Sequence, residues 1–316
     1  MRYLIVILGT LLTWLSVATI TLSAEPSPLS EVLRQTRFIT YTPRDFSLVN
    51  DKVTPPSVAG IQDDLQLLSP YFNGLITYAA DKGQERIPAI SRGFGFQAIM
   101  MGIWDPRSEV EIGNVIKAAK RYPKLINAVI VGNEGIYTKR YLPADVQQAM
   151  ARIKHECPTL AVTTSEPFFL YFKKEYADFF KSHDLLLPIV HPVFEPWFNP
   201  EEPTHGVEMV LNVANKFKES YDKPILIKET GLPSGPQGAS KFSPERQAIF
   251  WAELLKRFPT SSTLALSCFE AFDAPWKPGA IAKEFPGDHA SEAFWGFFTK
   301  TGEAKKVVSA LTRLPQ

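Results

Sequence analysis

Eight short apolar runs, separated by longer stretches, restrict how this chain can fold more than any other feature. The runs cover residues 37–43, 72–78, 96–104, 125–134, 159–167, 184–192, 224–231 and 263–272. Between them, apolar residues recur at helical spacing among charged ones, as at 108–122, 143–156 and 244–258. Strands that alternate with helices indicate a parallel sheet, and eight such units can close into a barrel. The sequence therefore predicts an α/β fold with one domain, a (β/α)8 TIM barrel.

An open, doubly wound sheet is the structural alternative. Such a sheet usually carries a glycine-rich phosphate loop that opens a helix. The nearest candidate, GFGFQ at 93–97, leads into a predicted strand instead. The barrel is therefore the favoured architecture.

A polar or aromatic residue lies at the end of every run. These residues are Tyr41, Tyr78, Trp104, Glu134, Glu166, His191, Glu229 and Glu270. A (β/α)8 barrel builds its active site at the carboxyl ends of its strands. We therefore expect these side chains to surround one cleft.

Glu134 and Glu229 stand out because each follows a run that is otherwise built for burial. A buried carboxylate without partners is costly, so such an acid needs a reason to be there. Strand alternation places Glu229 with Ile225 and Ile227, and if these isoleucines fill the barrel, Lys228 points to the helix layer. That orientation disfavours an aldolase in which Lys228 forms a Schiff base, because such a lysine would have to face into the barrel. The plain alternative, two salt-bridged loop acids, is less consistent with two identical contexts.

Two opposed acids in one cleft suit glycoside hydrolysis. One protonates the leaving oxygen while the other attacks the anomeric carbon, so their pKa values must differ. Asn133, beside Glu134, is placed to donate a hydrogen bond to the sugar 2-hydroxyl. The sequence predicts a catalytic pair made of Glu134 and Glu229.

The chain also resembles glycoside hydrolase family 17, the β-1,3-glucanases and β-1,3-glucanosyltransferases. The resemblance rests on AVIVGNE, HPVFEPW, KETGLPSG, FEAFDAPWK and FWG, which occur in family order. It implies a (β/α)8 barrel, retention of anomeric configuration, Glu134 as acid/base and Glu229 as nucleophile. The chain departs from the family pattern at Leu232, Ala274 and Phe294, which affects the expected sugar subsites rather than the pair.

Further residues are expected to bind the sugar chain. Aromatic side chains pack well against pyranose rings, although core packing is the alternative for each of them. The candidates are Tyr41, Tyr78, Trp104, Phe194, Trp197, Phe272 and Trp276, with the polar residues Asn133, Glu166, His191, Glu270 and Lys277. The five histidines show no ligand spacing, so we expect no metal and no cofactor.

Composition and the N-terminal segment indicate which binding partners and which cellular location to expect. A net charge of +1 gives no field that would attract nucleic acid. Residues 1–24 read as a signal peptide or a membrane anchor, 25–36 as a short leader and 37–316 as the catalytic domain. We expect an exported monomer, periplasmic, secreted or anchored outside the membrane, with Cys157 and Cys268 unpaired.

The sequence leaves the final activity open. Hydrolysis of β-1,3-glucan is favoured, and transfer to a second glucan chain is the alternative with the same catalytic pair. A glucan-binding protein without turnover is the alternative from another class. The presence of both acids argues against it, since a binding protein needs no nucleophile.

Overall fold

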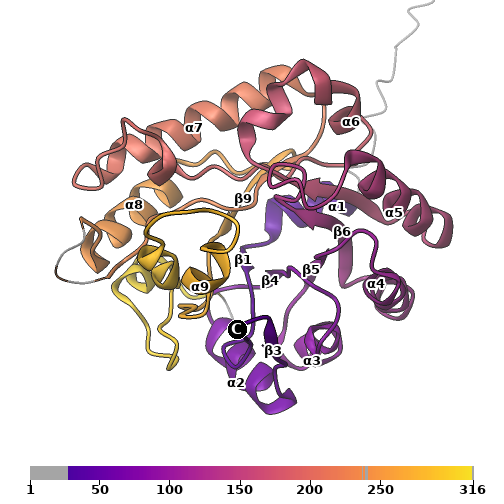
Figure 1. Ribbon diagram of the computed structural model, residues 1–316, viewed down its shortest axis with the longest axis horizontal. Coiled ribbons are helices and arrows are strands. Elements are labelled where there is room, and N and C mark those ends of the chain that lie inside the picture. Colours follow the sequence, from indigo (N-terminus) through magenta and orange to yellow (C-terminus); the bar gives the residue numbers. More distant parts are fainter. Residues whose placement is uncertain (1–27, 237, 239–240, 315–316) are drawn as a thin grey trace, which may run out of the picture.

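A parallel barrel forms the centre of the molecule (Figure 1). The computed structural model describes residues 28–236, 238 and 241–314. Seven strands form one sheet in the order β7-β6-β5-β4-β1-β9-β8, and neighbouring strands in it are all parallel. Their bounds are β1 Phe38–Thr40, β4 Gly74–Ile76, β5 Ala98–Ile103, β6 Ile126–Asn133, β7 Ala161–Ser165, β8 Ile225–Ile227 and β9 Leu264–Cys268.

The segment 184–190 occupies the remaining strand position, between β7 and β8. Parallel bridges join Ile189 to Pro167 on one side and to Glu229 on the other. The amide of Leu226 donates to the carbonyl of Leu186 at 2.9 Å, and the amide of Val190 donates to the carbonyl of Glu229 at 2.8 Å. All eight predicted runs therefore take part in the barrel, and the predicted (β/α)8 fold is confirmed.

Helices surround the strands on the outside (Figure 1). Three of them were predicted from their spacing, and Ser108 and Ser243 cap two of these by accepting hydrogen bonds from the amides of Glu111 and Arg246. A small hairpin, β2 Ser47–Val49 and β3 Lys52–Thr54, precedes α2. The helices are α2 Val58–Leu68, α3 Ile87–Ser91, α4 Glu109–Arg121, α5 Pro143–Glu156, α6 Ala177–Lys181, α7 Pro203–Ser220, α8 Pro244–Arg257 and α9 Lys277–Ile281.

Two apolar layers hold the barrel together. The smaller fills the interior and includes Ile76, Met100, Ile130 and Leu226, whereas the larger lies between the strands and the helices. Ile225 and Ile227 belong to the larger, outer layer. The predicted facing of this strand was therefore wrong: Leu226, and not the isoleucines, points into the barrel.

The folded part begins earlier than the predicted domain boundary at residue 37. Residues Pro28–Gln35, expected within a short leader, form α1, and Leu33 packs into the interior layer with Phe38. The helix carries an apolar stripe that needs a partner, and the start of the barrel provides one. The predicted signal peptide or anchor at 1–24 lies outside the described residues.

Two further expectations concern the chain as a whole. Within the described ranges, no helix is long and apolar enough to span a membrane. Cys157 and Cys268 are both free thiols, as predicted. Cys268 is buried, while Cys157 remains partly exposed.

Candidate active site

A tight turn after β6 carries Glu134. The backbone of Glu134 is left-handed, with φ of 53°, and its amide donates to the carbonyl of Ser165 at 2.8 Å. Gly132 has φ of 86°, and a Cβ there would lie 2.0 Å from the hydroxyl of Tyr141. Glycine is therefore required at this position, because both the backbone angle and the neighbouring ring exclude a side chain.

Glu166 fixes the same turn from the end of β7. Its two carboxylate oxygens accept hydrogen bonds from the amides of Ile136 and Tyr137, at 3.0 and 3.1 Å. The side chain is 0% exposed. Its predicted contact with sugar is therefore wrong: both oxygens serve the backbone that presents Glu134.

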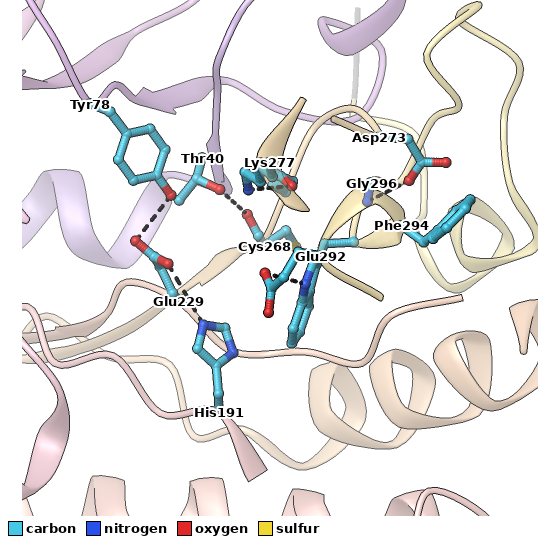
Figure 2. Close-up of polar contacts among 12 residues, drawn as sticks. Thr40, Tyr78, His191, Glu229, Cys268, Asp273, Lys277, Glu292, Phe294 and Gly296 are labelled. Atoms are coloured by element: carbon cyan, nitrogen blue, oxygen red, sulfur yellow. Dashed lines mark hydrogen bonds and ion pairs between the residues drawn. The ribbon is translucent and has the colours of Figure 1, made fainter. Parts of the chain in front are cut away.

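Glu229 lies at the centre of a polar cluster at the end of β8. Figure 2 shows its carboxylate between Tyr78 and His191, which approach it from opposite sides. The Tyr78 hydroxyl donates to Oε1 at 3.0 Å, and His191 Nε2 lies 3.7 Å from Oε2. These contacts hold the carboxylate in one orientation.

Lys228 is the third partner of Glu229. Its ammonium lies 2.6 Å from Glu229 Oε1, also donates to Asn133 Oδ1, and lies 4.1 Å from the ring centre of Tyr78. The residue is 1% exposed. The predicted orientation toward the helices was wrong, because Lys228 shares its strand face with Leu226, which points into the barrel. Glu229 also reaches the site, although it follows the last residue of β8, Ile227.

The two acids therefore have opposite electrostatic surroundings. Burial, with the charge of Glu229 as a second cause, raises the pKa of Glu134 to about 8. Burial by itself would raise the pKa of Glu229, but Lys228 and His191 outweigh it and lower that pKa to about 2. One acid is thus held protonated and the other ionised over a wide pH range.

Asn133 is oriented by the same lysine. An ammonium group can only donate, so it must contact the amide oxygen, and the Asn133 NH2 group is left to donate elsewhere. Within the part of the chain that the structure describes, that NH2 group has no hydrogen-bond partner. Its chemistry fits a contact with an acceptor such as a sugar hydroxyl.

Comparison with known proteins identifies the family. Residues 39–296 match the model of the BtgE/BtgC glycoside hydrolase domain. The chain belongs to the BtgE/BtgC glycoside hydrolase family. A curated relative, a glucan 1,3-beta-glucosidase of Arthroderma benhamiae, is 24% identical over 270 residues, covering 78% of this chain and 83% of the relative.

Solved structures support the same fold at low sequence identity. An endo-laminarinase from Formosa Hel1_33_131 matches with a TM-score of 0.68 and 21% identity, over 86% of this chain and 85% of that one. A glycoside hydrolase family 17 beta-1,3-glucanosyltransferase from Rhizomucor miehei matches with a TM-score of 0.61 and 20% identity, over 85% and 94%. These similarities establish the barrel of this BtgE/BtgC family member.

The other predicted sugar-binding aromatics divide into exposed and buried ones. Trp104, Phe194 and Trp197 are 43%, 66% and 54% exposed, so their rings are accessible. Tyr41 is 0% exposed and its hydroxyl donates to Asp64 at 3.0 Å. Phe272 is 3% exposed, with its ring against Tyr41 and Arg44. The sequence-based assignment of Tyr41 to sugar contact is therefore wrong, since its ring is fully buried and its hydroxyl is bound by Asp64. Phe272 lines a small pocket with Trp276, so its assignment stays a prediction.

A second ion pair lies after β9. Lys277 Nζ donates to Glu270 Oε1 at 2.6 Å, and burial, opposed by this lysine, raises the pKa of Glu270 to about 7. Glu270 is 2% exposed and, with Trp276, lines a small pocket at the end of β1. Because the Glu270 carboxylate is buried and paired with Lys277, Trp276 and Lys277 remain the better candidates for contact with a sugar.

The sequence reasoning missed Lys228 as a site residue of this family member. Its position directly before Glu229 was visible, but the apolar residues before it gave no inward or outward signal. Among the described residues, no group of three or more His, Cys, Asp or Glu side chains is arranged to hold a metal ion.

Proposed function

We propose that this protein is a retaining hydrolase of β-1,3-glucan and a member of glycoside hydrolase family 17. The curated relative named as a glucan 1,3-beta-glucosidase and the neighbours named as an endo-laminarinase and a beta-1,3-glucanosyltransferase support the substrate. The near-neutral charge supports an uncharged polysaccharide rather than an ionic substrate.

One observation carries the proposal. Glu134 and Glu229 lie at the ends of β6 and β8, and their surroundings shift their pKa values in opposite directions: that of Glu134 is raised, in part by the charge of Glu229, and that of Glu229 is lowered. Glu229, ionised, is the nucleophile. Its oxygen bonds to the anomeric carbon as the glycosidic bond breaks, and Glu134 gives its proton to the leaving oxygen. Glu134 then takes a proton from water, whose oxygen attacks the anomeric carbon and releases Glu229.

The test is the stereochemistry of the first product. Purified protein is incubated with laminarihexaose and the anomeric protons are followed by NMR. We expect the β-anomer first, with the α-anomer appearing later by mutarotation. Initial formation of the α-anomer would exclude Glu229 as nucleophile, and absence of cleavage in the wild-type protein would remove the hydrolase proposal.

Transfer to a second glucan chain is the alternative with the same residues. The exposed rings of Phe194 and Trp197 favour it, because aromatic platforms can hold an acceptor sugar and exclude water. A time course at high laminarihexaose concentration separates the two. Early products longer than the substrate, without matching growth of reducing ends, would assign the protein as a transferase.

We also propose that the protein is exported, as the leader at 1–24 suggests, and that it is a monomer. Cell fractionation and the N-terminal sequence of the mature protein test the export and distinguish cleavage from anchoring. Light scattering of the purified chain tests the monomer. A dimer at micromolar concentration would contradict it.

A further inference from the structure

Lys228 places a positive charge inside the candidate active site, and in the steps described above its one role is to hold Glu229 ionised. The ammonium lies 2.6 Å from the Glu229 carboxylate and is 1% exposed, so water screens its charge poorly. We propose that Lys228 is a positioning residue that pairs with Glu229 in the free enzyme and promotes deprotonation of Glu134 once Glu229 has become an ester. This inference rests on the proposed retaining mechanism.

Lys228 is surrounded by groups from several strand ends of the barrel. Glu229 is its ion partner, Asn133 accepts a hydrogen bond from it, and Tyr78 presents its ring. Glu134 and Lys277 act on it through charge, the first favouring its protonated form and the second opposing it. Apart from Glu229, the only negative charge among these groups that can neutralise Lys228 is that of Glu134.

The first step of the reaction changes this balance. Before it, the lysine cation and the Glu229 anion compensate each other. When Glu229 bonds to the anomeric carbon it becomes a neutral ester, and the proton of Glu134 leaves with the departing sugar oxygen. Burial lowers the pKa of Lys228, so without the charge of Glu229 the ammonium needs another negative charge, and an ionised Glu134 provides it.

The second step needs Glu134 as a base. The free enzyme has the opposite requirement, and there the charge of Glu229 helps to keep Glu134 protonated. Loss of that charge lowers the pKa of Glu134 in any retaining enzyme. The charge of Lys228 also acts to lower it, and it does so without compensation only in the covalent intermediate. Lys228 therefore acts most strongly against the protonated form of Glu134 in the covalent intermediate, where Glu134 must act as a base.

The experiment compares the wild type with Lys228→Met, which keeps the unbranched apolar stem and removes the ammonium group. The substrate is 2,4-dinitrophenyl β-laminaribioside, whose leaving group needs no proton, so kcat/KM reports formation of the intermediate and kcat its breakdown. We expect kcat to fall roughly tenfold to a hundredfold. At a pH above the raised pKa of Glu229 in the variant, kcat/KM should fall less than kcat, so KM should fall as well. A burst of dinitrophenolate should precede the slow steady state.

Two additions separate base catalysis from damage to the site. Azide attacks the intermediate without a base, so it should restore turnover of Lys228→Met and yield the β-glycosyl azide. The rate of breakdown should also recover as the pH is raised, because removing the cation raises the pKa of Glu134 in the intermediate. Lys228→Arg, which keeps a cation, should show a smaller loss of kcat.

Lys223→Met is the matched control. Lys223 lies before the same strand and donates to the carbonyl of His183, away from the catalytic pair. It should lower the thermal unfolding temperature without a change in kcat. Equal losses of kcat and kcat/KM in Lys228→Met, with no response to azide, would overturn the inference, as would an unchanged kcat. Failure of the wild type to cleave the substrate would instead remove the proposed function.

Discussion

The ends of β6 and β8 carry the same acid in the same barrel position, yet hold it by different means. At β8, the Glu229 carboxylate has three side-chain partners, namely Lys228, Tyr78 and His191. At β6, no side chain among the described residues forms a hydrogen bond to the Glu134 carboxyl group. There the backbone is fixed instead, through the left-handed turn and the amides bound by Glu166.

This difference shows what sets the roles of two identical side chains. Burial raises the pKa of both acids, so burial does not distinguish them. The adjacent cation does, because it reverses the shift at Glu229 and leaves the shift at Glu134 in place. A nucleophile needs a fixed, ionised oxygen, whereas an acid/base needs a carboxyl group that can gain and lose a proton. The two constructions meet these needs separately.

Glu229→Gln should reduce activity more than any other substitution considered. The amide cannot form the covalent intermediate, so we expect a loss of kcat on the order of 10⁴-fold or more. The measurement is hydrolysis of laminarihexaose, with circular dichroism as a control for folding. Activity within tenfold of the wild type would show that another residue is the nucleophile.

Glu134→Gln should have a large effect that depends on the leaving group. Loss of general acid catalysis should slow laminarihexaose about 10²- to 10⁴-fold. Formation of the intermediate from a dinitrophenyl glycoside should change little, and azide should accelerate its breakdown. An equal loss with both leaving groups and no effect of azide would remove Glu134 from the acid/base role.

Glu166→Gln tests whether the turn, and not the side chain alone, positions Glu134. The new NH2 group faces a backbone amide, so one hydrogen bond becomes a donor-donor contact and stability should fall by about 1 to 3 kcal/mol. We expect kcat to fall roughly tenfold or more through misplacement of Glu134. Calorimetry and the kinetics of laminarihexaose hydrolysis measure the two effects.

Glu111→Gln is the control for this prediction. Glu111 is also buried and accepts from the amide of Ala80, after β4, and from the amides of Trp104 and Asp105, after β5. It should lose similar stability, with an effect on KM rather than on kcat. Equal effects of both variants on kcat would mean that Glu166 acts only through overall stability.

The fold and the positions of Glu134 and Glu229 at the strand ends were predictable because they depend on order along the chain. Eight apolar runs followed by polar residues define a barrel and its active face, whatever the details of packing. Glu134 and Glu229 follow from that order. The facing of β8 does not, because Ile225, Leu226 and Ile227 are all buried and an apolar run without alternation carries no inward or outward signal.

The role of Glu166 was unpredictable for a different reason. At the end of a strand it looks like Glu134 and Glu229, and its partners lie some thirty residues away, in a turn whose shape the sequence does not reveal. Tyr41 is similar, because its hydroxyl is satisfied by Asp64 from α2. Position on the barrel can be inferred from sequence, whereas the direction of a side chain depends on contacts between distant segments.

Tyr78→Phe should have the smallest effect on activity. The change removes one donor to Glu229 and keeps the ring beside Lys228. Burial and the charge of Glu229 raise the pKa of Tyr78, so the tyrosine is a neutral donor throughout the working range. A donated hydrogen bond favours the ionised carboxylate, and its loss should therefore raise the pKa of Glu229. The acidic limb of the kcat/KM profile should move to higher pH, whereas the basic limb, set by Glu134, should stay in place. Near neutral pH the loss should be below about tenfold, because a single hydrogen bond to a charged group is at stake and Lys228 remains. The measurement is kcat/KM for laminarihexaose across pH, and a shift confined to the basic limb would mean that Tyr78 acts on Glu134 instead.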